Sequence, residues 1–325
     1  MSVIEYAVAV GSDRLAERLF GPGHEALTRV PAQRVGEVLT EFDSDDARLT
    51  LSRTEVLLTG WDTPPLPASV LRRANRLRRV IHAGGATGHL FPDGAGGIAT
   101  SDIGAANAIP VAELTLAMII LANKDAFRSR DLLRERRAFI DREAEFATAG
   151  NYARTVGLVS ASRTGRAVVE LLRPFPSLRI LVYDPLLTPG DAEAMGVEKV
   201  DLPELMRRSD VVSLHAPVLP ETVGLIDTSM LARMPDGATL INTARGVIVD
   251  AAALEKELVS RRINAILDVT DPEPLPPASP LYDLPNVFLT PHIAGSMGTE
   301  LRRMGDVVAA DLAHYVHEVC GRAGA

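Results

Sequence analysis

Short, continuous hydrophobic runs recur through the second half of the chain and predict the strands of a parallel sheet. The runs do not alternate with polar residues, which is typical of strands that helices cover on both faces. Segments with helical spacing lie between them. The six runs are residues 155–159, 180–184, 211–215, 238–242, 265–269 and 287–290. Six strands joined by helical crossovers predict a doubly wound α/β domain of the Rossmann type.

The first hundred residues show the same alternation on a smaller scale. Hydrophobic runs at 4–10, 56–60 and 80–84 predict strands, and residues 14–20 and 67–77 predict helices. Glycines at 84, 85 and 88 then interrupt the pattern. This part of the chain therefore predicts a second parallel α/β domain.

Two helical segments connect these halves. The first has Pro110 where a first helical turn is expected, and it is apolar on nearly all sides as far as Ala122, which indicates burial between domains or subunits. The second, near the C-terminus, is expected to return to the first domain. The predicted division is thus 1–105 with 294–325 for one domain and 106–293 for the other.

Length, charge and cysteine content narrow the class of protein. The 325 residues suit two domains. With 34 basic and 42 acidic residues the net charge is -8, which argues against nucleic acid as a partner. The single cysteine fits a reducing compartment, and residues 114–122, the longest apolar stretch, are shorter than the ~18 residues of a membrane span. A soluble, cytoplasmic protein is predicted, and no metal-ligand spacing is present.

Three polar side chains follow hydrophobic runs of the second series. Arg245 comes after 238–242, Glu273 after 265–269 and His292 after 287–290. Because ligands of open α/β sheets bind at the carboxyl ends of the strands, all three are expected at one binding edge. Arg can hold a carboxylate in bidentate fashion, His can deliver a proton, and Glu can hold the imidazole in place. This set suits carbonyl reduction.

A candidate phosphate-binding loop runs from Ser160 to Gly165, between the first strand of the series and a helix. Serines at 160 and 162 stand where G-x-G-x-x-G has its first two glycines, but the helix N-terminus can still bind pyrophosphate. Arg163 could add a direct contact with a phosphate group. Asp184 lies 19 residues after Gly165, close to the ~20 expected of a ribose-binding acid, and favours NAD over NADP. A plain strand–helix turn and a turn-initiating Asp before Pro185 are the alternatives.

Three segments taken together resemble the D-isomer-specific 2-hydroxyacid dehydrogenases. They are SDVVSLHAPVLPETVGLID, MPDGATLINTARGVIVD and SPLYDLPNVFLTPHIAGS. The resemblance implies a Rossmann dinucleotide domain, a flavodoxin-like substrate domain and a homodimer formed through the former. Arg245 would bind the substrate carboxylate and carbonyl, His292 would be the acid/base, and Glu273 would be its partner.

The resemblance also assigns binding residues. The backbone amides of Gly85, Ala86 and Thr87 would bind the substrate carboxylate, and Asp268 would accept a hydrogen bond from the nicotinamide carboxamide. The residues expected around NAD are Ser162, Arg163, Thr164, Gly165, Asp184, His215, Thr243, Ala244, Asp268 and Gly295.

The predicted function is hydride transfer between NAD(H) and a 2-keto or 2-hydroxy acid, with D-specificity implied by the resemblance. The alternative is a non-catalytic dinucleotide-sensing or scaffold protein on the same fold. The complete Arg, Glu and His set favours the enzyme, whereas the serine-containing loop favours the alternative. Thr87, His89 and Thr270 depart from the family pattern, so the substrate preference is not carried over. His82 and His89 are expected more often as loop or interface residues than as substrate contacts.

Overall fold

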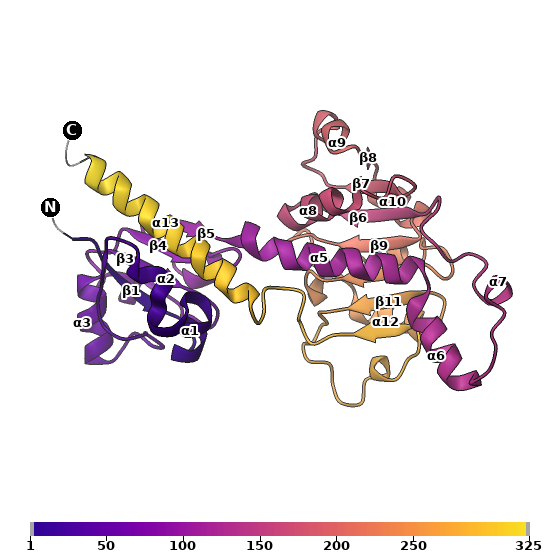
Figure 1. The fold of residues 1–325 in the computed structure, drawn as a ribbon, viewed down its shortest axis with the longest axis horizontal. Helices are drawn as coiled ribbons and strands as arrows, with labels where there is room; N and C mark the ends of the chain where they lie inside the picture. The colour runs from indigo at the N-terminus through magenta and orange to yellow at the C-terminus, as the bar shows by residue number, and fades with distance from the viewer. Residues whose placement is uncertain (1–2, 323–325) are drawn as a thin grey trace. The chain divides into compact units, whose positions relative to one another are not determined.

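The computed structural model describes residues 3–322, which fall into two compact α/β units (Figure 1). Among the described residues, unit 1 contains 3–107 and 296–322, and unit 2 contains 108–295. Each predicted domain boundary lies two residues before the corresponding boundary between the units. The last segment of the chain therefore belongs with the first.

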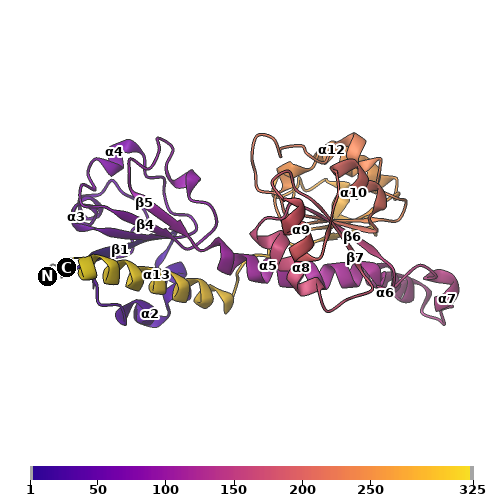
Figure 2. The same cartoon turned by 90° about the horizontal axis from the view of Figure 1, so that it is seen from above.

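Unit 1 has a five-stranded, fully parallel sheet with the order β2-β1-β3-β4-β5. This is the flavodoxin-like order. The strands are β1 (Glu5–Ala9), β2 (Gln33–Arg34), β3 (Val56–Thr59), β4 (Arg79–His82) and β5 (Ala99–Asp102). The helices are α1 (Asp13–Phe20), α2 (Glu25–Thr28), α3 (Asp45–Arg53), α4 (Ala68–Leu71) and α13 (Glu300–Arg322). Figure 2 shows α2 and α13 on one face of the sheet and α3 and α4 on the other.

The C-terminal helix α13 completes the core of unit 1. Met304, Val308 and Leu312 are fully buried in the cluster that α1 and the inner faces of β1, β3 and β4 also form. At the rim of this contact, Arg79 donates to Asp311 at 2.7 Å. Burial of three large apolar side chains stabilises the docked helix by several kcal/mol, roughly 1.5–3 kcal/mol each.

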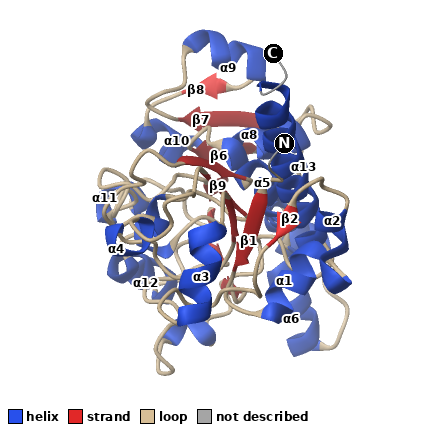
Figure 3. Cartoon of the chain, turned by 90° about the vertical axis from the view of Figure 1, so that its left-hand side faces the viewer, coloured by secondary structure: helices blue, strands red, loops and turns tan. Residues whose placement is uncertain are grey.

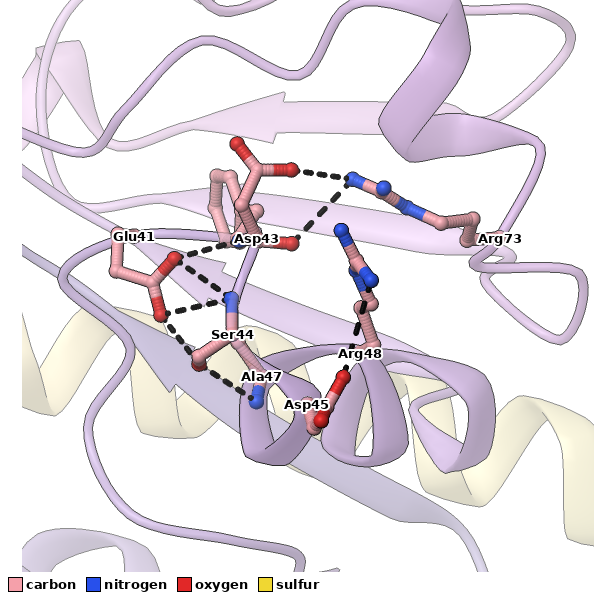
Figure 4. A network of polar contacts seen from close by, with 8 residues as sticks. Glu41, Asp43, Ser44, Asp45, Ala47, Arg48 and Arg73 are labelled. Carbon is pink, nitrogen blue, oxygen red and sulfur yellow. Dashed lines mark hydrogen bonds and ion pairs between the residues drawn. The ribbon is translucent and has the colours of Figure 1, made fainter.

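Local hydrogen bonds fix the acidic loop before α3 (Figure 4). The Glu41 carboxylate accepts from the backbone N–H groups of Asp43 and Ser44 and from the Ser44 hydroxyl. Ser44 in turn accepts from the N–H of Ala47, which makes it the N-cap of α3. Arg73 donates to Asp43 at 3.0 Å and balances part of the acidic charge. The loop is thus held by its own side chains and by Arg73.

Unit 2 has a seven-stranded, fully parallel sheet with the order β12-β11-β10-β9-β6-β7-β8. The strand order reverses between β6 and β9, as in a Rossmann fold. The strands are β6 (Thr155–Val159), β7 (Arg179–Tyr183), β8 (Glu198–Lys199), β9 (Val211–Leu214), β10 (Thr239–Asn242), β11 (Asn264–Leu267) and β12 (Val287–Leu289). The doubly wound prediction is confirmed.

Helices cover both faces of this sheet. The helices of unit 2 are α5 (Gly104–Asn123), α6 (Ala126–Arg136), α7 (Arg142–Glu145), α8 (Arg163–Leu172), α9 (Pro189–Met195), α10 (Leu202–Arg208), α11 (Thr228–Leu231) and α12 (Ala251–Val259). Helices α6 and α7 bury no residue. One hydrophobic cluster joins α5, α8 and α9 to the sheet, and another joins α10, α11 and α12 to the opposite face. The strands are buried on both sides, which explains their continuously apolar sequences.

The pattern of hydrophobic residues missed three short strands. Figure 3 shows one of them, β2, beside β1. The two-residue strands Gln33–Arg34 and Glu198–Lys199 and the edge strand Ala99–Asp102 are polar and partly exposed, so they carry no apolar run. Edge strands have one neighbour only and need less apolar surface than central strands.

Two predicted helices differ from the observed ones. The helix expected over 67–77 is regular only over α4, and the chain continues in turns. Pro110 was expected in a first turn, but α5 already begins at Gly104 and Pro110 lies inside it. That prediction was wrong because residues 104–109 continue the helix upstream. A proline inside a helix removes one backbone hydrogen bond.

Helix α5 is long and apolar enough to cross a membrane by length and composition, with a mean hydropathy of 1.8 over its best window. Ala112 and Ile119 are fully buried against strands and α8 of unit 2, and Met118 is nearly so. A core helix of a folded domain meets the same criteria, so α5 belongs to the core.

Candidate active site

Arg245, Glu273 and His292 lie at one edge of the sheet in unit 2. They follow β10, β11 and β12, which are hydrogen-bonded neighbours in that order. Because all three strands are parallel, their carboxyl ends meet at the same edge. All three side chains are exposed. The structure therefore brings the predicted trio to a single accessible edge.

His292 and Glu273 form a direct pair. Nδ1 of His292 lies 2.8 Å from Oε1 of Glu273. The two side chains are 44% and 42% exposed, so the pair contributes little to stability but fixes the ring orientation. With Nδ1 engaged, Nε2 is the ring nitrogen available for proton exchange. His292 also has φ = +54°, an uncommon conformation for a residue other than glycine.

Asp268 holds the segment that carries His292. Its buried carboxylate accepts from Thr290 Oγ1 at 2.6 Å and from the N–H groups of Ile293 and Ala294 at 2.8 and 2.9 Å. Its carbonyl oxygen accepts from the N–H of His292 at 2.9 Å. Charge-assisted hydrogen bonds are about twice as strong as neutral ones. The sequence suggested only a cofactor contact for Asp268 and gave no indication of this role.

Asn242 shapes the turn that presents Arg245. Its side chain donates to the carbonyl oxygen of Arg245 at 2.9 Å and accepts from the N–H of Ala244 at 3.0 Å. Next in the chain is Gly246, where an added Cβ would lie 2.0 Å from the carbonyl oxygen of Thr270. No other residue fits at 246 without displacing the backbone that leads to Glu273. The turn thus couples the positions of Arg245 and Glu273.

Thr243 is buried, and its hydroxyl pairs with that of Thr115 from α5 at 3.0 Å. Ala244 is partly exposed beside it. Thr115 is fully buried and lies in an apolar helix, so no sequence signal marked it. The Thr115–Thr243 pair anchors the beginning of the Arg245 turn.

The serine-containing loop is tied to the acid at the end of β7. Ser160 has φ = +86°, in the region that favours glycine. Its hydroxyl donates to Asp184 Oδ2 at 3.0 Å, and the N–H of Ala161 donates to the same oxygen at 2.8 Å. Asp184 Oδ1 accepts from the N–H of Leu186 at 2.8 Å. A hydrogen bond to a carboxylate therefore accompanies the strained backbone at Ser160.

Gly165, at the third glycine position of the G-x-G-x-x-G pattern, is a glycine for a steric reason. A Cβ on Gly165 would lie 2.1 Å from the carbonyl oxygen of Ser160. The N–H of Gly165 donates to Ser162 Oγ at 3.3 Å, which makes Ser162 the N-cap of α8. Arg163 and Thr164 form the first turn of α8. The helix N-terminus, the close approach at Gly165 and Asp184 are compatible with a bound dinucleotide.

His215 lies behind this loop, directly after β9. A Cβ on Gly165 would lie 3.6 Å from that of His215. The ring is buried, and neither nitrogen has a hydrogen-bond partner among the described residues. Burial lowers the pKa of His215 to about 4, so the ring is neutral at pH 7. Unsatisfied buried polar atoms are costly.

The other predicted residues occupy two further places. Gly295 is the last residue of unit 2 and is partly buried. Gly85, Ala86 and Thr87 belong to unit 1, in the loop that follows β4. None of the three loop residues donates its backbone N–H to an acceptor within residues 3–322. Three consecutive free amides suit a carboxylate ligand.

No group of His, Cys, Asp and Glu side chains with metal-binding geometry is found within residues 3–322. The prediction of no metal stays a prediction.

Unit 1 has a flavodoxin-like fold and unit 2 has a Rossmann fold. Unit 2 also has the features of a dinucleotide-binding domain, which are the loop between β6 and α8, the N-terminus of α8 and Asp184. The family model described as "D-isomer specific 2-hydroxyacid dehydrogenase, NAD binding domain" matches residues 116–294, more than half of the chain. The chain belongs to this family, and unit 2 is its NAD-binding domain.

Known proteins support the same assignment. The chain is 32% identical over 270 residues to D-3-phosphoglycerate dehydrogenase of Mycobacterium tuberculosis H37Rv, covering 82% of this chain and 50% of that protein. Over 206 residues it is 37% identical to glyoxylate reductase of Thermofilum pendens, a match that covers 62% of this chain and 60% of that protein. It thus spans about half the length of the first of these relatives.

A solved structure, a phosphoglycerate oxidoreductase from Rhizobium etli, matches with a TM-score of 0.76 and 26% identity over 95% of this chain and 94% of the other. The agreement over nearly the full length of both chains extends the family fold to unit 1.

Proposed function

We propose that this protein is an NAD-dependent 2-hydroxyacid dehydrogenase that acts as a D-specific reductase of 2-keto acids. The observation that carries the proposal is the His292–Glu273 pair, at 2.8 Å, on the same sheet edge as Arg245. A proton donor and a carboxylate-binding cation are what reduction of a 2-keto acid requires of the protein.

Each residue of the trio has a separate task. NADH, when bound, supplies the hydride. Arg245 binds the substrate carboxylate and polarises the carbonyl oxygen, so that this oxygen can accept negative charge. Nε2 of His292 gives its proton to that oxygen, and Glu273 stabilises the ring through Nδ1. Because His292 is exposed, it regains its proton from solvent.

Cofactor binding is assigned to the loop between β6 and α8. The N-terminus of α8, with Ser162, Arg163, Thr164 and Gly165, would hold the pyrophosphate. Asp184 would accept from the adenosine ribose and repel a 2′-phosphate, which favours NAD over NADP. His215 would face the cofactor from behind the loop, and Thr243, Ala244, Asp268 and Gly295 would lie near the nicotinamide.

A second copy of the chain is the proposed macromolecular partner, bound through unit 2. Leu133 on α6 is 56% exposed and Phe139, between α6 and α7, is 91% exposed. Beside α6, a cavity of about 600 Å³ lies at the sheet edge opposite the trio and includes the stacked rings of Phe127 and Phe288. Exposed apolar side chains such as Leu133 and Phe139 are typical of an interface. The acidic net charge opposes nucleic acid, and a soluble, cytoplasmic protein is proposed.

Substitution of His292 tests the proposed function. His292→Ala should lower kcat for reduction of a responsive 2-keto acid by ~10²–10⁴, the usual worth of a general acid, while NADH binding stays unchanged. The assay follows NADH absorbance over a panel of 2-keto acids. Wild-type protein that binds NADH but reduces none of them would favour the non-catalytic alternative, a dinucleotide sensor or scaffold.

A further inference from the structure

Two histidines flank the loop of unit 1 to which the family resemblance assigns the substrate carboxylate. His82 is the last residue of β4, and His89 follows the loop in a short 3₁₀ turn. Between them lie Gly85, Ala86 and Thr87, whose N–H groups have no acceptor within residues 3–322. The conformation of residues 84–87 therefore decides whether these groups converge on one anion.

His82 holds the beginning of the loop. Its ring is 2% exposed, and Nδ1 lies 3.0 Å from the hydroxyl of Thr59 on the neighbouring strand. A Cβ on Gly84 would lie 2.4 Å from Nε2 of His82, so the ring lies against the backbone at Gly84. The N–H of Gly84 also donates to the carbonyl oxygen of His82 at 2.8 Å. Ring and backbone together allow Gly84 very little freedom.

His89 holds the other end. Nδ1 of His89 lies 3.1 Å from the carbonyl oxygen of Ala86 and donates to it. The two imidazoles also touch, with centroids 5.3 Å apart and planes at 69°, an edge-to-face contact. Both ends of the loop are thus connected through a single pair of rings.

His82 holds the beginning of the loop as a neutral ring. Burial lowers the pKa of His82 to about 4, with a smaller contribution from His89, so His82 is neutral at pH 7. A neutral ring packs against Gly84 without the desolvation cost of a charge.

We propose that His82 and His89 are positioning residues that clamp residues 84–87 in the conformation that presents three backbone N–H groups to the substrate carboxylate. This inference rests on the proposed function, because it takes the substrate to be a 2-keto acid. Neither histidine takes part in proton transfer. Their effect is on substrate binding, since a pre-ordered loop loses less conformational entropy when the ligand binds.

Variants of His89 test the clamp, because this side chain is exposed and its loss should not unfold the protein. His89→Ala should raise KM for the 2-keto acid roughly three- to tenfold, the usual worth of a hydrogen bond, with kcat within about twofold and Kd for NADH unchanged. His89→Asn is the matched variant, because the amide nitrogen can reach Ala86 as Nδ1 does, and it should restore most of the affinity. His89→Phe keeps only the ring contact and should restore less.

Thr59→Val removes the hydroxyl that orients His82 and keeps the volume of the buried side chain. It should raise KM in the same direction as His89→Ala. An unchanged KM in both variants would overturn the clamp, and so would an equal loss in His89→Asn and His89→Ala. A fall in kcat at constant KM would also contradict it, because it would indicate a role in the chemical step.

Hydrogen exchange provides a readout that does not depend on turnover. His89→Ala should speed exchange of the hydrogen-bonded N–H groups of Gly84 and Leu90, which donate to the carbonyl oxygens of His82 and Thr87, whereas His89→Asn should leave it near the wild-type rate. If wild-type protein reduces no 2-keto acid, the proposed function and the substrate role of the loop both fail. The exchange rates then still decide whether the histidines hold the loop, and equal rates in all variants would refute that as well.

Discussion

Replacing Asp268 by Asn should both destabilise unit 2 and displace the proton donor. The carboxylate accepts three hydrogen bonds, from Thr290 and from the N–H groups of Ile293 and Ala294. These two N–H groups donate to different oxygens, and the amide of Asn has only one. In either orientation its NH₂ group faces a backbone donor, so at least one bond is lost.

The magnitude follows from the strength of such bonds. A hydrogen bond to a charged group contributes about 1.5–3 kcal/mol, and the remaining bonds of Asp268→Asn lose their charge assistance. The expected loss is about 2–4 kcal/mol, a large part of a typical folding free energy of 5–15 kcal/mol. Because His292 lies within the released segment, kcat should also fall by ~10², as for a misplacement of about 1 Å.

Urea unfolding followed by circular dichroism measures the first effect, and NADH oxidation with a 2-keto acid measures the second. Thr290→Val is the control, since it removes one of the three bonds to Asp268 and should cost less. If Asp268 served only as an acceptor for the nicotinamide carboxamide, Asp268→Asn would weaken NADH binding and leave the unfolding midpoint unchanged. That result would refute the structural role.

Three further predictions follow from other parts of the molecule. Ser162→Ala should lower stability by about 1 kcal/mol and Ser162→Gly by only a few tenths, because Ser162 caps α8; equal losses in urea unfolding would contradict the cap. Asp184→Ala should narrow the preference for NADH over NADPH, and a wild-type protein that binds NADPH more tightly by fluorescence titration would remove this role. Burial lowers the folded-state pKa of both His82 and His215 to about 4, so the unfolded chain binds more protons between its own pKa of about 6.5 and pH 4. The free energy of unfolding should therefore be constant above pH 6.5. Below pH 6.5 each of the two histidines should lower it by up to about 1.4 kcal/mol per pH unit. A urea midpoint that does not change from pH 7 to 5 would show that these rings are not buried in the neutral form.

The hydrophobic pattern of the chain specifies the elements that bury apolar residues. The six runs of unit 2 become central or paired strands because a strand covered on both faces must be hydrophobic throughout. This regularity also placed Arg245, Glu273 and His292 at one edge, since parallel strands put all their carboxyl ends on the same side. The polar strands β2 and β8 carried no such signal.

The partners of the polar groups depend on how the chain folds. Asp268 and Thr290 lie 22 residues apart in the chain, and Ser160 and Asp184 lie 24 apart. Hydrogen bonds of this kind depend on distances of about 3 Å between segments that the sheet brings together, and no periodicity in the sequence encodes them. The same holds for His82 and His89, whose rings meet because the loop between them folds back. Hydrophobic patterning fixes the layers of this protein, whereas the contacts that hold its functional side chains arise once those layers have packed.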